Sequence, residues 1–470
     1  MISEQLLQQR ILANLPYKPT LQQSQLIAAL AKFCTDPSMQ PTVFVLNGYA
    51  GTGKTSLVAA LVNALEDMRV NTVLLAPTGR AAKVLSGFSG HSAYTVHRYI
   101  YRTDFESGQF TSLKENKSRP GTVFIVDESS MIDSTDNESK SLNLLDDLLQ
   151  YVYSGDECRL IFLGDTAQLP PVSSSIEIPL HLALRKRFFH VLRASLTATV
   201  RQAADSGILY NATWLRKAMA RDEIPMPKIF SEQFNDVSII GAEDLPDELQ
   251  KAYSDYGMDE TIIITRSNKR AVDYNLAVRN LILERTSMLS RGDMLMIAKN
   301  NYFWTKSVKG LEFIANGDMV IVEKVIGEEE FAGMTFADVE LSFPDHDDIT
   351  LQAKINITSL VSDAPAITAA ELRRLGMACI DNPDVYPPGT PDSVRIQGLR
   401  KDPYYNALQV KYGYAITCHK AQGGQWMAVF IDIGFLPEDT DRLEFYRWLY
   451  TAVTRASKEV YFINPGIVIE

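Results

Sequence analysis

A glycine-rich segment at residues 48–55 matches the phosphate-loop pattern G-x-x-x-x-G-K-T and follows directly on the apolar run Thr42–Leu46. Glycines let the backbone N–H groups of such a loop turn inward and bind phosphate oxygens, and a helix that starts there adds a favourable dipole. We expect Lys54 to reach the β- and γ-phosphates and the Thr55 hydroxyl to bind Mg²⁺. The residues that we expect to contact a nucleoside triphosphate are Gly48, Ala50, Gly51, Thr52, Gly53, Lys54, Thr55 and Ser56.

Two adjacent carboxylates follow a second apolar run, residues 123–126. Asp127 is placed to hold Mg²⁺ through water, and Glu128 to orient and deprotonate the water that attacks the γ-phosphate. Taken alone, an apolar run that ends in Asp-Glu is a common strand terminus, but its position after a phosphate loop favours the catalytic interpretation. Together the two motifs predict hydrolysis of ATP or GTP, and they do not indicate what the energy is used for.

The elements that hold these residues are predicted to be parallel strands alternating with helices. From residue 42 to about residue 200, short apolar runs alternate with helical stretches, and each run is continuous, which is typical of strands covered on both faces. The pattern begins again at Thr261–Ile264 and ends at Val460–Ile463. We therefore predict two α/β domains of similar type.

Two segments interrupt this pattern. Residues 99–120 are polar and turn-rich with isolated aromatics, which indicates a hairpin inserted in the first domain. Residues from about 290 to 405 contain β-type runs around the turn signal Asn316-Gly317-Asp318, and a Pro-rich loop, which together indicate an inserted β-rich subdomain like a small barrel. The predicted division assigns 1–200 to the first domain, 201–289 and 406–470 to the second, and 290–405 to the insert.

The composition excludes some classes of protein. The formal net charge of −11 argues against a histone-like protein that coats nucleic acid by bulk electrostatics. Lysines and arginines focused in one groove can still bind a strand, because screening limits each charge to about 10 Å at 0.1 M salt. The four cysteines form no C-x-x-C pair, which excludes the usual zinc and redox spacings, and the N-terminus lacks the pattern of a secretion signal. We expect a cytoplasmic protein that does not cross a membrane.

Seven motifs stand in order along the chain, the last of them ending at residue 456. They are Ala76–Lys83, Thr95–Arg98, Asp127–Met131, Gly164–Val172, Thr265–Asn268 with Asn275 and Arg279, Tyr414–Gly423, and Tyr450–Ala456. This set resembles the motifs of the superfamily 1 helicases of the RecD/Dda group, superfamily 1B. One departure follows Gly423, where the family usually has a small and then an acidic residue and this chain has Gly424-Gln425-Trp426.

The resemblance implies two tandem RecA-like motor domains with ATP and Mg²⁺ in the cleft between them. It assigns Gln25 to reading the adenine edge, Gln168 to sensing the γ-phosphate, and Arg455 to the arginine finger supplied by the second domain. Arg201 is assigned as a second arginine of this kind. An ordinary surface position remains the alternative for both Gln25 and Arg201.

A strand-binding groove across both domains is also implied by the resemblance. Hydroxyl, imidazole and cationic side chains in it would contact the phosphate backbone, so binding would be independent of sequence and sensitive to salt. The aromatic side chain of Phe105 or Phe110 in the hairpin is either the wedge that separates base pairs or a packed loop anchor. The predicted contacts are Pro77, Thr78, Thr95, His97, Arg98, Asn268, Thr417, His419 and Lys420.

The function that the resemblance implies is that of an ATP-dependent DNA helicase, working as a monomer on single-stranded DNA and duplex junctions. It also implies 5′→3′ movement and a place in DNA repair or recombination, with partner proteins from those processes. Alternatives stay open at this point: a single-strand-stimulated translocase without unwinding activity, and an RNA helicase. The residues themselves indicate neither the direction of movement nor the choice between DNA and RNA.

Overall fold

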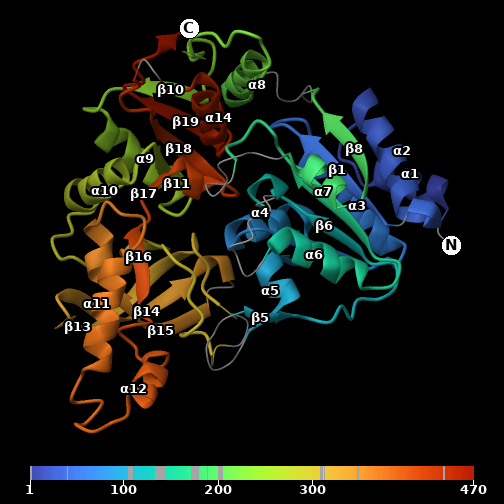
Figure 1. Ribbon diagram of the computed structural model, residues 1–470. Helices are drawn as coiled ribbons and strands as arrows, with labels where there is room; N and C mark the ends of the chain where they lie inside the picture. The colour runs from blue at the N-terminus through green and yellow to red at the C-terminus, as the bar shows by residue number, and fades with distance from the viewer. Residues whose placement is uncertain are drawn as a thin grey trace.

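The computed structural model describes residues 3–39, 41–103, 110–132, 143–170, 179–187, 189–198, 205–306, 308, 311, 313–346, 349–437 and 440–470. Figure 1 shows two α/β domains side by side, the N-terminal one on the right and the C-terminal one at the upper left, with a β-rich unit below the latter. Each α/β domain has its own parallel sheet. This arrangement confirms the predicted class, two tandem RecA-like domains with inserts.

The first domain is built on a six-stranded sheet in the order β3-β2-β6-β7-β1-β8, with every neighbouring pair parallel. Alternate residues point to opposite faces, so Val43 and Val45 join one core cluster while Phe44 and Leu46 join another. Because helices cover both faces, the strands read as continuous apolar runs. The strands are β1 (Thr42–Gly48), β2 (Thr72–Ala76), β3 (Ala93–Thr95), β6 (Val123–Val126), β7 (Arg159–Gly164) and β8 (His190–Leu196). The helices are α1 (Glu4–Ala13), α2 (Leu21–Thr35), α3 (Lys54–Asp67), α4 (Gly79–Ser89), α5 (Val96–Ile100), α6 (Leu144–Tyr153) and α7 (Leu180–Lys186).

The second domain has a five-stranded parallel sheet in the order β10-β19-β18-β11-β17. Every residue of its strand β11 is buried, as expected for a strand in the interior of a covered parallel sheet. The strands are β10 (Val237–Ile240), β11 (Thr261–Thr265), β17 (Ala415–Thr417), β18 (Trp426–Asp432) and β19 (Ala456–Ile463). The helices are α8 (Gly207–Met219), α9 (Leu245–Tyr256), α10 (Asn268–Ala277), α13 (Cys418–Ala421) and α14 (Arg442–Val453).

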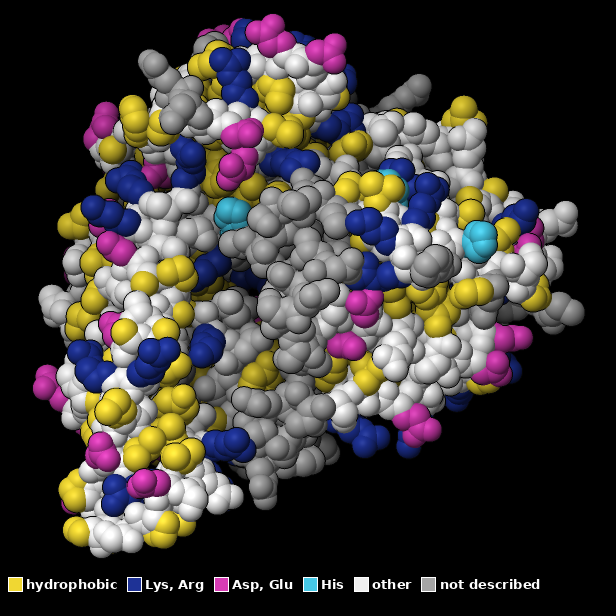
Figure 2. All heavy atoms as spheres, in the orientation of Figure 1, with side chains coloured by type: hydrophobic (Ala, Val, Ile, Leu, Met, Phe, Trp, Pro, Cys, Tyr) yellow, Lys and Arg dark blue, Asp and Glu magenta, His cyan; other side chains and the backbone are white. Residues whose placement is uncertain are grey.

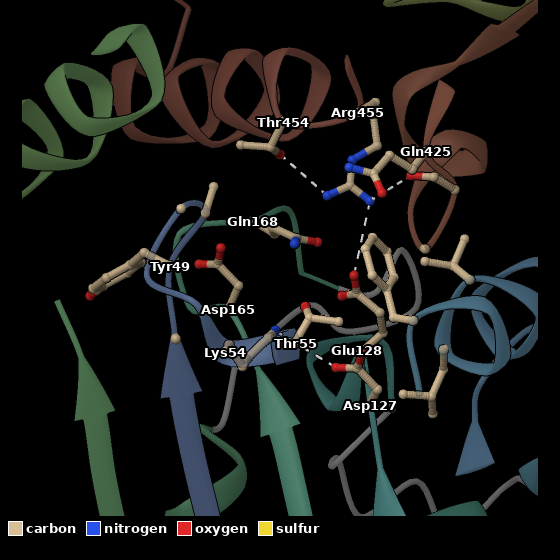
Figure 3. A pocket seen from close by; sticks show the side chains of 18 of the residues that line it. Tyr49, Lys54, Thr55, Asp127, Glu128, Asp165, Gln168, Gln425, Thr454 and Arg455 are labelled. Atoms are coloured by element: carbon tan, nitrogen blue, oxygen red, sulfur yellow. Dashed lines mark hydrogen bonds and ion pairs between the residues drawn. The ribbon is translucent and has the colours of Figure 1, made fainter. Parts of the chain in front are cut away.

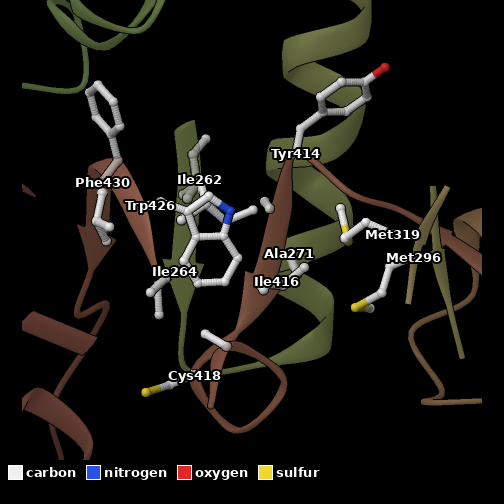
Figure 4. Close-up of a cluster of buried hydrophobic side chains, with 14 of the residues drawn as sticks. Ile262, Ile264, Ala271, Met296, Met319, Tyr414, Ile416, Cys418, Trp426 and Phe430 are labelled. Atoms are coloured by element: carbon white, nitrogen blue, oxygen red, sulfur yellow. The ribbon is translucent and has the colours of Figure 1, made fainter. Parts of the chain in front are cut away.

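A closed five-stranded barrel is inserted in the second domain. Its Met296 and Met319 belong to the same buried cluster as Ile416 and Trp426 of the motor sheet, so barrel and domain share one core (Figure 4). The barrel extends beyond the proposed limit at residue 405, because its last strand pairs with both β12 and β15 before the chain re-enters the motor sheet at β17. The strands are β12 (Met294–Ile297), β13 (Met319–Phe331), β14 (Met334–Phe343), β15 (Ile349–Asn356) and β16 (Leu408–Tyr412).

Two helices project from the barrel where the sequence indicated only β-type runs and a Pro-rich loop. Helix α11 (Ala369–Ile380) begins with a capping box between Thr368 and Glu371, and α12 (Asp392–Leu399) follows the Pro-rich turn. Leu375 of α11 packs against Phe336 of the barrel, which holds the projection in place.

The predicted hairpin is present as the antiparallel pair β4 (Tyr101–Thr103) and β5 (Phe110–Leu113). Phe105 and the side chain of Phe110 lie outside what the structure describes, so the wedge stays a prediction. The remaining short elements are the parallel pair β9 (Lys228–Ile229) and β20 (Val468–Ile469), the 3₁₀ turns Pro37–Met39, Ser129–Met131, Pro344–His346 and Ile357–Val361, and a π-helical turn at Val278–Ile282.

Candidate active site and strand groove

The phosphate loop connects β1 to α3 at the carboxyl edge of the first sheet. Gly51 and Gly53 adopt left-handed backbone angles, with φ of 71° and 75°, which glycine tolerates better than other residues. A Cβ at Gly48 would lie 3.0 Å from the Lys54 side chain, so this glycine leaves room for the lysine to fold over the loop. The loop thus has the conformation that its sequence predicts, and residues 48–51 and 53–56 line one cavity.

A glutamine of helix α2 supports the loop, and it is Gln23 rather than Gln25, whose predicted contact is with adenine. Gln23 is 1% exposed, and its Nε2 donates a hydrogen bond of 2.9 Å to the carbonyl oxygen of Thr52. Gln25 is exposed on the same helix and is absent from the described lining of the cavity. The sequence contained a signal for Gln23, because Thr20 and Gln23 form a capping box that turns this side chain inward.

The two carboxylates after β6 face the loop lysine. Lys54 Nζ lies 3.7 Å from Asp127 Oδ1, and the Glu128 backbone N–H donates to the same oxygen at 2.8 Å. Glu128 has a φ of 49°, an uncommon value for a residue with a side chain, and such strain is typical of functional positions. Its Oε2 is buried and has no hydrogen-bond partner in the protein, so this oxygen is available to a ligand or water.

Burial and opposite charges together set the protonation of the site. Burial lowers the pKa of Lys54, but Asp127, Glu128 and Asp165 outweigh it and leave the pKa raised, so the lysine stays charged. Burial raises the pKa of Glu128 against the opposing effect of Lys54 and Arg455. A carboxylate with a raised pKa is a stronger base than an ordinary glutamate, which suits the activation of water.

Arg455 enters the same cavity from the second domain. The cavity has a volume of about 300 Å³ and is lined from one side by the phosphate loop and from the other by residues 423–425 and 454–456. Arg455 Nη1 lies 4.0 Å from Glu128 Oε1, and Figure 3 shows its guanidinium above the carboxylates. Hydrogen bonds to the carbonyl oxygens of Thr451 and Gly424, at 3.1 Å each, hold the guanidinium in position. The predicted arginine and lysine therefore share one cleft.

Further contacts join the domains beside the cavity. The segment that follows β7 contains Asp165 and Gln168, and two hydrogen bonds join it to α14. The Leu169 N–H donates to Thr451 Oγ1 at 2.9 Å. Tyr450 Oη donates to Asp165 Oδ2 at 2.6 Å. Gln168 lines the cavity and is buried, with no hydrogen-bond partner for its Oε1. Its position beside the phosphate loop agrees with the parallel pairing of β7 and β1.

A second arginine is predicted for this site. Arg201 lies outside the described residues, so its assignment stays a prediction. Arg216 of α8 was not anticipated: its guanidinium stacks 4.4 Å from the centre of the Tyr49 ring, next to the phosphate loop. Nothing in its local sequence distinguishes Arg216 from a surface arginine on a helix.

The residues present fit a magnesium–nucleotide group. Thr55 and Asp127 both line the cavity, and they offer a hydroxyl and a carboxylate beside the unpartnered oxygen of Glu128. Mg²⁺ binds such oxygen ligands while keeping several waters and contacting substrate phosphates. Among the described residues no group of three or more His, Cys, Asp or Glu side chains could hold a metal by itself.

The predicted strand contacts lie at the starts of helices that follow parallel strands. Thr78, Thr95 and Thr417 are the N-cap residues of α4, α5 and α13, and Asn268 is the first residue of α10. Free backbone N–H groups and the helix dipole at such positions favour phosphate. A Cβ at Gly423 would lie 3.3 Å from Thr78 Oγ1, so the two domains meet at these residues. Pro77 directly precedes the Thr78 cap.

The cationic and imidazole contacts are less exposed than expected. Burial lowers the pKa of His97 to about 4, and it also lowers the pKa values of His419 and Lys420. His97 is therefore neutral at pH 7 and offers a hydrogen bond rather than a charge. Arg98 lines a second cavity of about 360 Å³ and stacks 5.5 Å from the Tyr94 ring. On the face in Figure 2, basic side chains are interspersed with acidic ones rather than gathered in one basic face.

The barrel forms the opposite wall of this second cavity. Its 3₁₀ turn Pro344–His346 contributes Asp345, whose carboxylate lies 2.9 Å from Lys83 Nζ of α4. Lys83 Nζ also donates to the Pro344 carbonyl oxygen at 3.1 Å. A barrel carboxylate thus lies beside the predicted contacts Thr95 and Arg98.

The segment after Gly423 makes a contact between the two domains. Trp426 is 2% exposed, and the Arg80 guanidinium from the first domain stacks 4.0 Å from the centre of its ring. Arg80 Nη2 also donates to the Gln425 carbonyl oxygen at 3.4 Å. A cation–π contact with Trp426 therefore joins the domains one residue after Gln425, which stands where the family usually has an acidic residue.

Two RecA-like domains meet around the phosphate-loop cavity, so a nucleoside triphosphate bound there would contact both domains. The family model of an AAA domain matches residues 20–224, and that of a UvrD-like helicase C-terminal domain matches residues 412–463. These matches and the seven ordered motifs make the chain similar to the RecD/Pif1-like helicases of superfamily 1B. No described helix is both long enough and apolar enough to cross a membrane.

Relatives with known names match parts of the chain. The ATP-dependent RecD2 DNA helicase of Deinococcus radiodurans is 33% identical over 168 residues, which is 36% of this chain and 21% of that protein. The ATP-dependent DNA helicase dda of Enterobacteria phage T4 is 35% identical over 132 residues, 27% of this chain and 28% of dda. An uncharacterized protein of Acanthamoeba polyphaga mimivirus, R530, is 22% identical over 90% of this chain and 95% of its own length. Among solved structures, the Bacteroides Pif1 helicase in complex with ADP-AlF3 and ssDNA covers 97% of this chain and 95% of its own, at 16% identity and a TM-score of 0.47.

Proposed function

We propose that the protein is an ATP-dependent DNA helicase that hydrolyses ATP to move along single-stranded DNA and unwind duplex. The observation that carries the proposal is the position of Arg455, which reaches from the second domain to within 4.0 Å of Glu128 in the cavity that holds Lys54. Hydrolysis in such a site needs residues from both domains. Binding of the nucleotide and closure of the cleft between the domains therefore depend on each other. This dependence is what a motor requires.

In the proposed reaction some groups of the protein bind the nucleotide and others take part in the chemical step. The backbone N–H groups of the loop and Lys54 bind the triphosphate, while Thr55 and Asp127 hold the Mg²⁺ that neutralises phosphate charge. Glu128 accepts the proton of the attacking water, which its raised pKa favours. Arg455 stabilises the negative charge that spreads over the transferred phosphoryl group, and Gln168 responds to the presence of that group.

Movement follows from contacts of both domains with one strand. Helix starts from both domains hold phosphates without reading bases, so closing the cleft would draw the two contact sets together along the strand. We further propose 5′→3′ movement, action as a monomer at duplex junctions, a cytoplasmic location, and a role in DNA repair or recombination, on the basis of the family. RecD2 and dda, the two named relatives, are both ATP-dependent DNA helicases.

Unwinding of matched 5′-tailed and 3′-tailed DNA duplexes with ATP and Mg²⁺ tests the proposal. We expect strand separation of the 5′-tailed duplex only, and ATP hydrolysis stimulated by single-stranded DNA more than by RNA of the same length. Stimulated hydrolysis without strand separation would identify a translocase that does not unwind by itself. Absence of nucleic-acid-stimulated hydrolysis would refute the motor function altogether.

A further inference from the structure

One hydroxyl group of the second domain contacts the phosphate loop itself. Tyr450 of α14 is 1% exposed, and its Oη accepts a hydrogen bond of 3.0 Å from the Ala50 backbone N–H. The same Oη donates to Asp165 Oδ2 at 2.6 Å. Tyr450 therefore bridges the loop and the segment after β7, both of which belong to the first domain.

Ala50 lies in the phosphate loop, whose backbone N–H groups bind phosphate oxygens in proteins of this type, and it lines the cavity. A triphosphate in the loop and the Tyr450 hydroxyl are both acceptors, and they compete for this donor. The hydroxyl cannot simply turn away, because Asp165 is fixed by a further hydrogen bond of 2.9 Å from the Ala167 N–H to its Oδ1. Release of Ala50 therefore requires a shift of helix α14 relative to the first domain.

The same helix leads directly to the residue that completes hydrolysis. Arg455 follows Tyr450 just beyond the end of α14, and Thr451 between them accepts from the Leu169 N–H while its carbonyl oxygen accepts from Arg455 Nε. A shift of Tyr450 is thus transmitted to Arg455 through the helix and these hydrogen bonds.

We infer that Tyr450 is a positioning residue that couples occupancy of the phosphate loop to the placement of Arg455, by occupying the Ala50 donor until a triphosphate takes it. The inference rests on the proposed ATPase function and adds a residue outside the predicted set. Burial and Asp165 raise the pKa of the Tyr450 hydroxyl well above its usual value, so the hydroxyl keeps its proton and can donate to Asp165.

The test compares wild-type protein with Tyr450→Phe, which removes only the hydroxyl. Because the competing acceptor is lost, we expect the variant to bind the non-hydrolysable analogue AMP-PNP with Mg²⁺ roughly 2- to 10-fold more tightly, the worth of one neutral hydrogen bond. Because α14 loses its tether, we expect kcat for single-strand-stimulated ATP hydrolysis to fall about 10-fold while KM for ATP falls as well. A merely structural role would raise KM or leave it unchanged.

Tyr446→Phe is the matched control. Tyr446 lies one turn earlier on α14, is fully buried, and donates to the Pro225 carbonyl oxygen at 3.0 Å, away from the loop. We expect its AMP-PNP affinity and kcat to equal those of the wild type, with thermal melting measured for all three proteins. Equal or weaker AMP-PNP binding by Tyr450→Phe would overturn the inference. A wild type that hydrolyses no ATP would refute the proposed function instead, while the binding comparison would still decide the role of Tyr450.

Discussion

Arg455 Nη1 stands 4.0 Å from Glu128 Oε1, although the two residues belong to different domains. The arginine is held by carbonyl oxygens of its own domain, and the glutamate sits on a strained backbone at the end of β6. Neither side chain can make this approach unless the carboxyl edge of the first sheet faces the amino edge of the second, where Arg455 directly precedes β19. The catalytic assignments and the motor function both depend on this one distance.

Lys54→Ala is expected to abolish ATP hydrolysis while leaving binding to single-stranded DNA measurable, because the lysine contacts the nucleotide side of the cleft only. Steady-state hydrolysis and fluorescence anisotropy with a labelled oligonucleotide measure the two properties. Lys251→Ala, at a side chain that is 62% exposed on α9, is the control and should match the wild type. Hydrolysis by Lys54→Ala at the wild-type rate would rule out the assigned nucleotide site.

Arg455→Ala is expected to lower kcat for ATP by about 10³- to 10⁵-fold, the usual effect of an arginine that stabilises phosphoryl transfer from across a cleft. Arg455→Lys should recover little activity, because lysine lacks the planar fork that reaches both the carbonyl oxygens and the phosphate. Arg442→Ala provides the comparison, because Arg442 is the first residue of α14, the helix that precedes Arg455, and contacts the Ile224 carbonyl oxygen. A loss below tenfold in Arg455→Ala would assign the residue to structure alone.

The lowered pKa of His97 predicts that the stability of the protein depends on pH. Burial lowers the pKa of the His97 imidazole to about 4 in the folded protein, against about 6.5 in the unfolded chain. Between these two values the unfolded chain binds more protons than the folded protein does. The free energy of unfolding therefore falls as the pH falls. Between pH 7 and pH 5 the loss amounts to about 2 kcal/mol. Urea unfolding at both pH values should show a smaller acid-induced loss for His97→Gln than for the wild type.

The control for this measurement is His190→Gln, at an exposed position on β8, which should lose stability as the wild type does. Identical pH dependence in His97→Gln and the wild type would show that the imidazole is not buried in the neutral form.

Asp345→Asn is expected to tighten binding of single-stranded DNA several-fold at low salt. Its carboxylate lies 2.9 Å from Lys83 in the cavity that contains Thr95 and Arg98, so removing the charge frees a cation for phosphate and removes a repulsion. Anisotropy titrations at two salt concentrations measure the effect, which should shrink as salt rises. Asp381→Asn is the control: the Asp381 side chain is 69% exposed at the end of α11, and this variant should bind single-stranded DNA with the wild-type affinity. Wild-type affinity in Asp345→Asn would instead place the strand away from this cavity.

The local features of the site could be predicted from the sequence. The phosphate loop, the carboxylates after β6 and the continuous apolar strands depend on neighbours in the chain, and their strand-to-helix context follows from glycine, periodicity and dipole arguments. The order of the motifs identified Arg455 as the partner of Lys54, and the barrel was anticipated from turn signals.

Other features were decided only by the tertiary structure, because they depend on residues remote in sequence. The packing of α2 on the loop directs Gln23 inward and leaves Gln25 exposed. Arg80 and Trp426 stack, and Tyr450 reaches Ala50, only because two separately folded sheets meet at one angle. Strand β16 belongs to the barrel because its hydrogen-bond partners are β12 and β15, and no local pattern specifies which strands will pair.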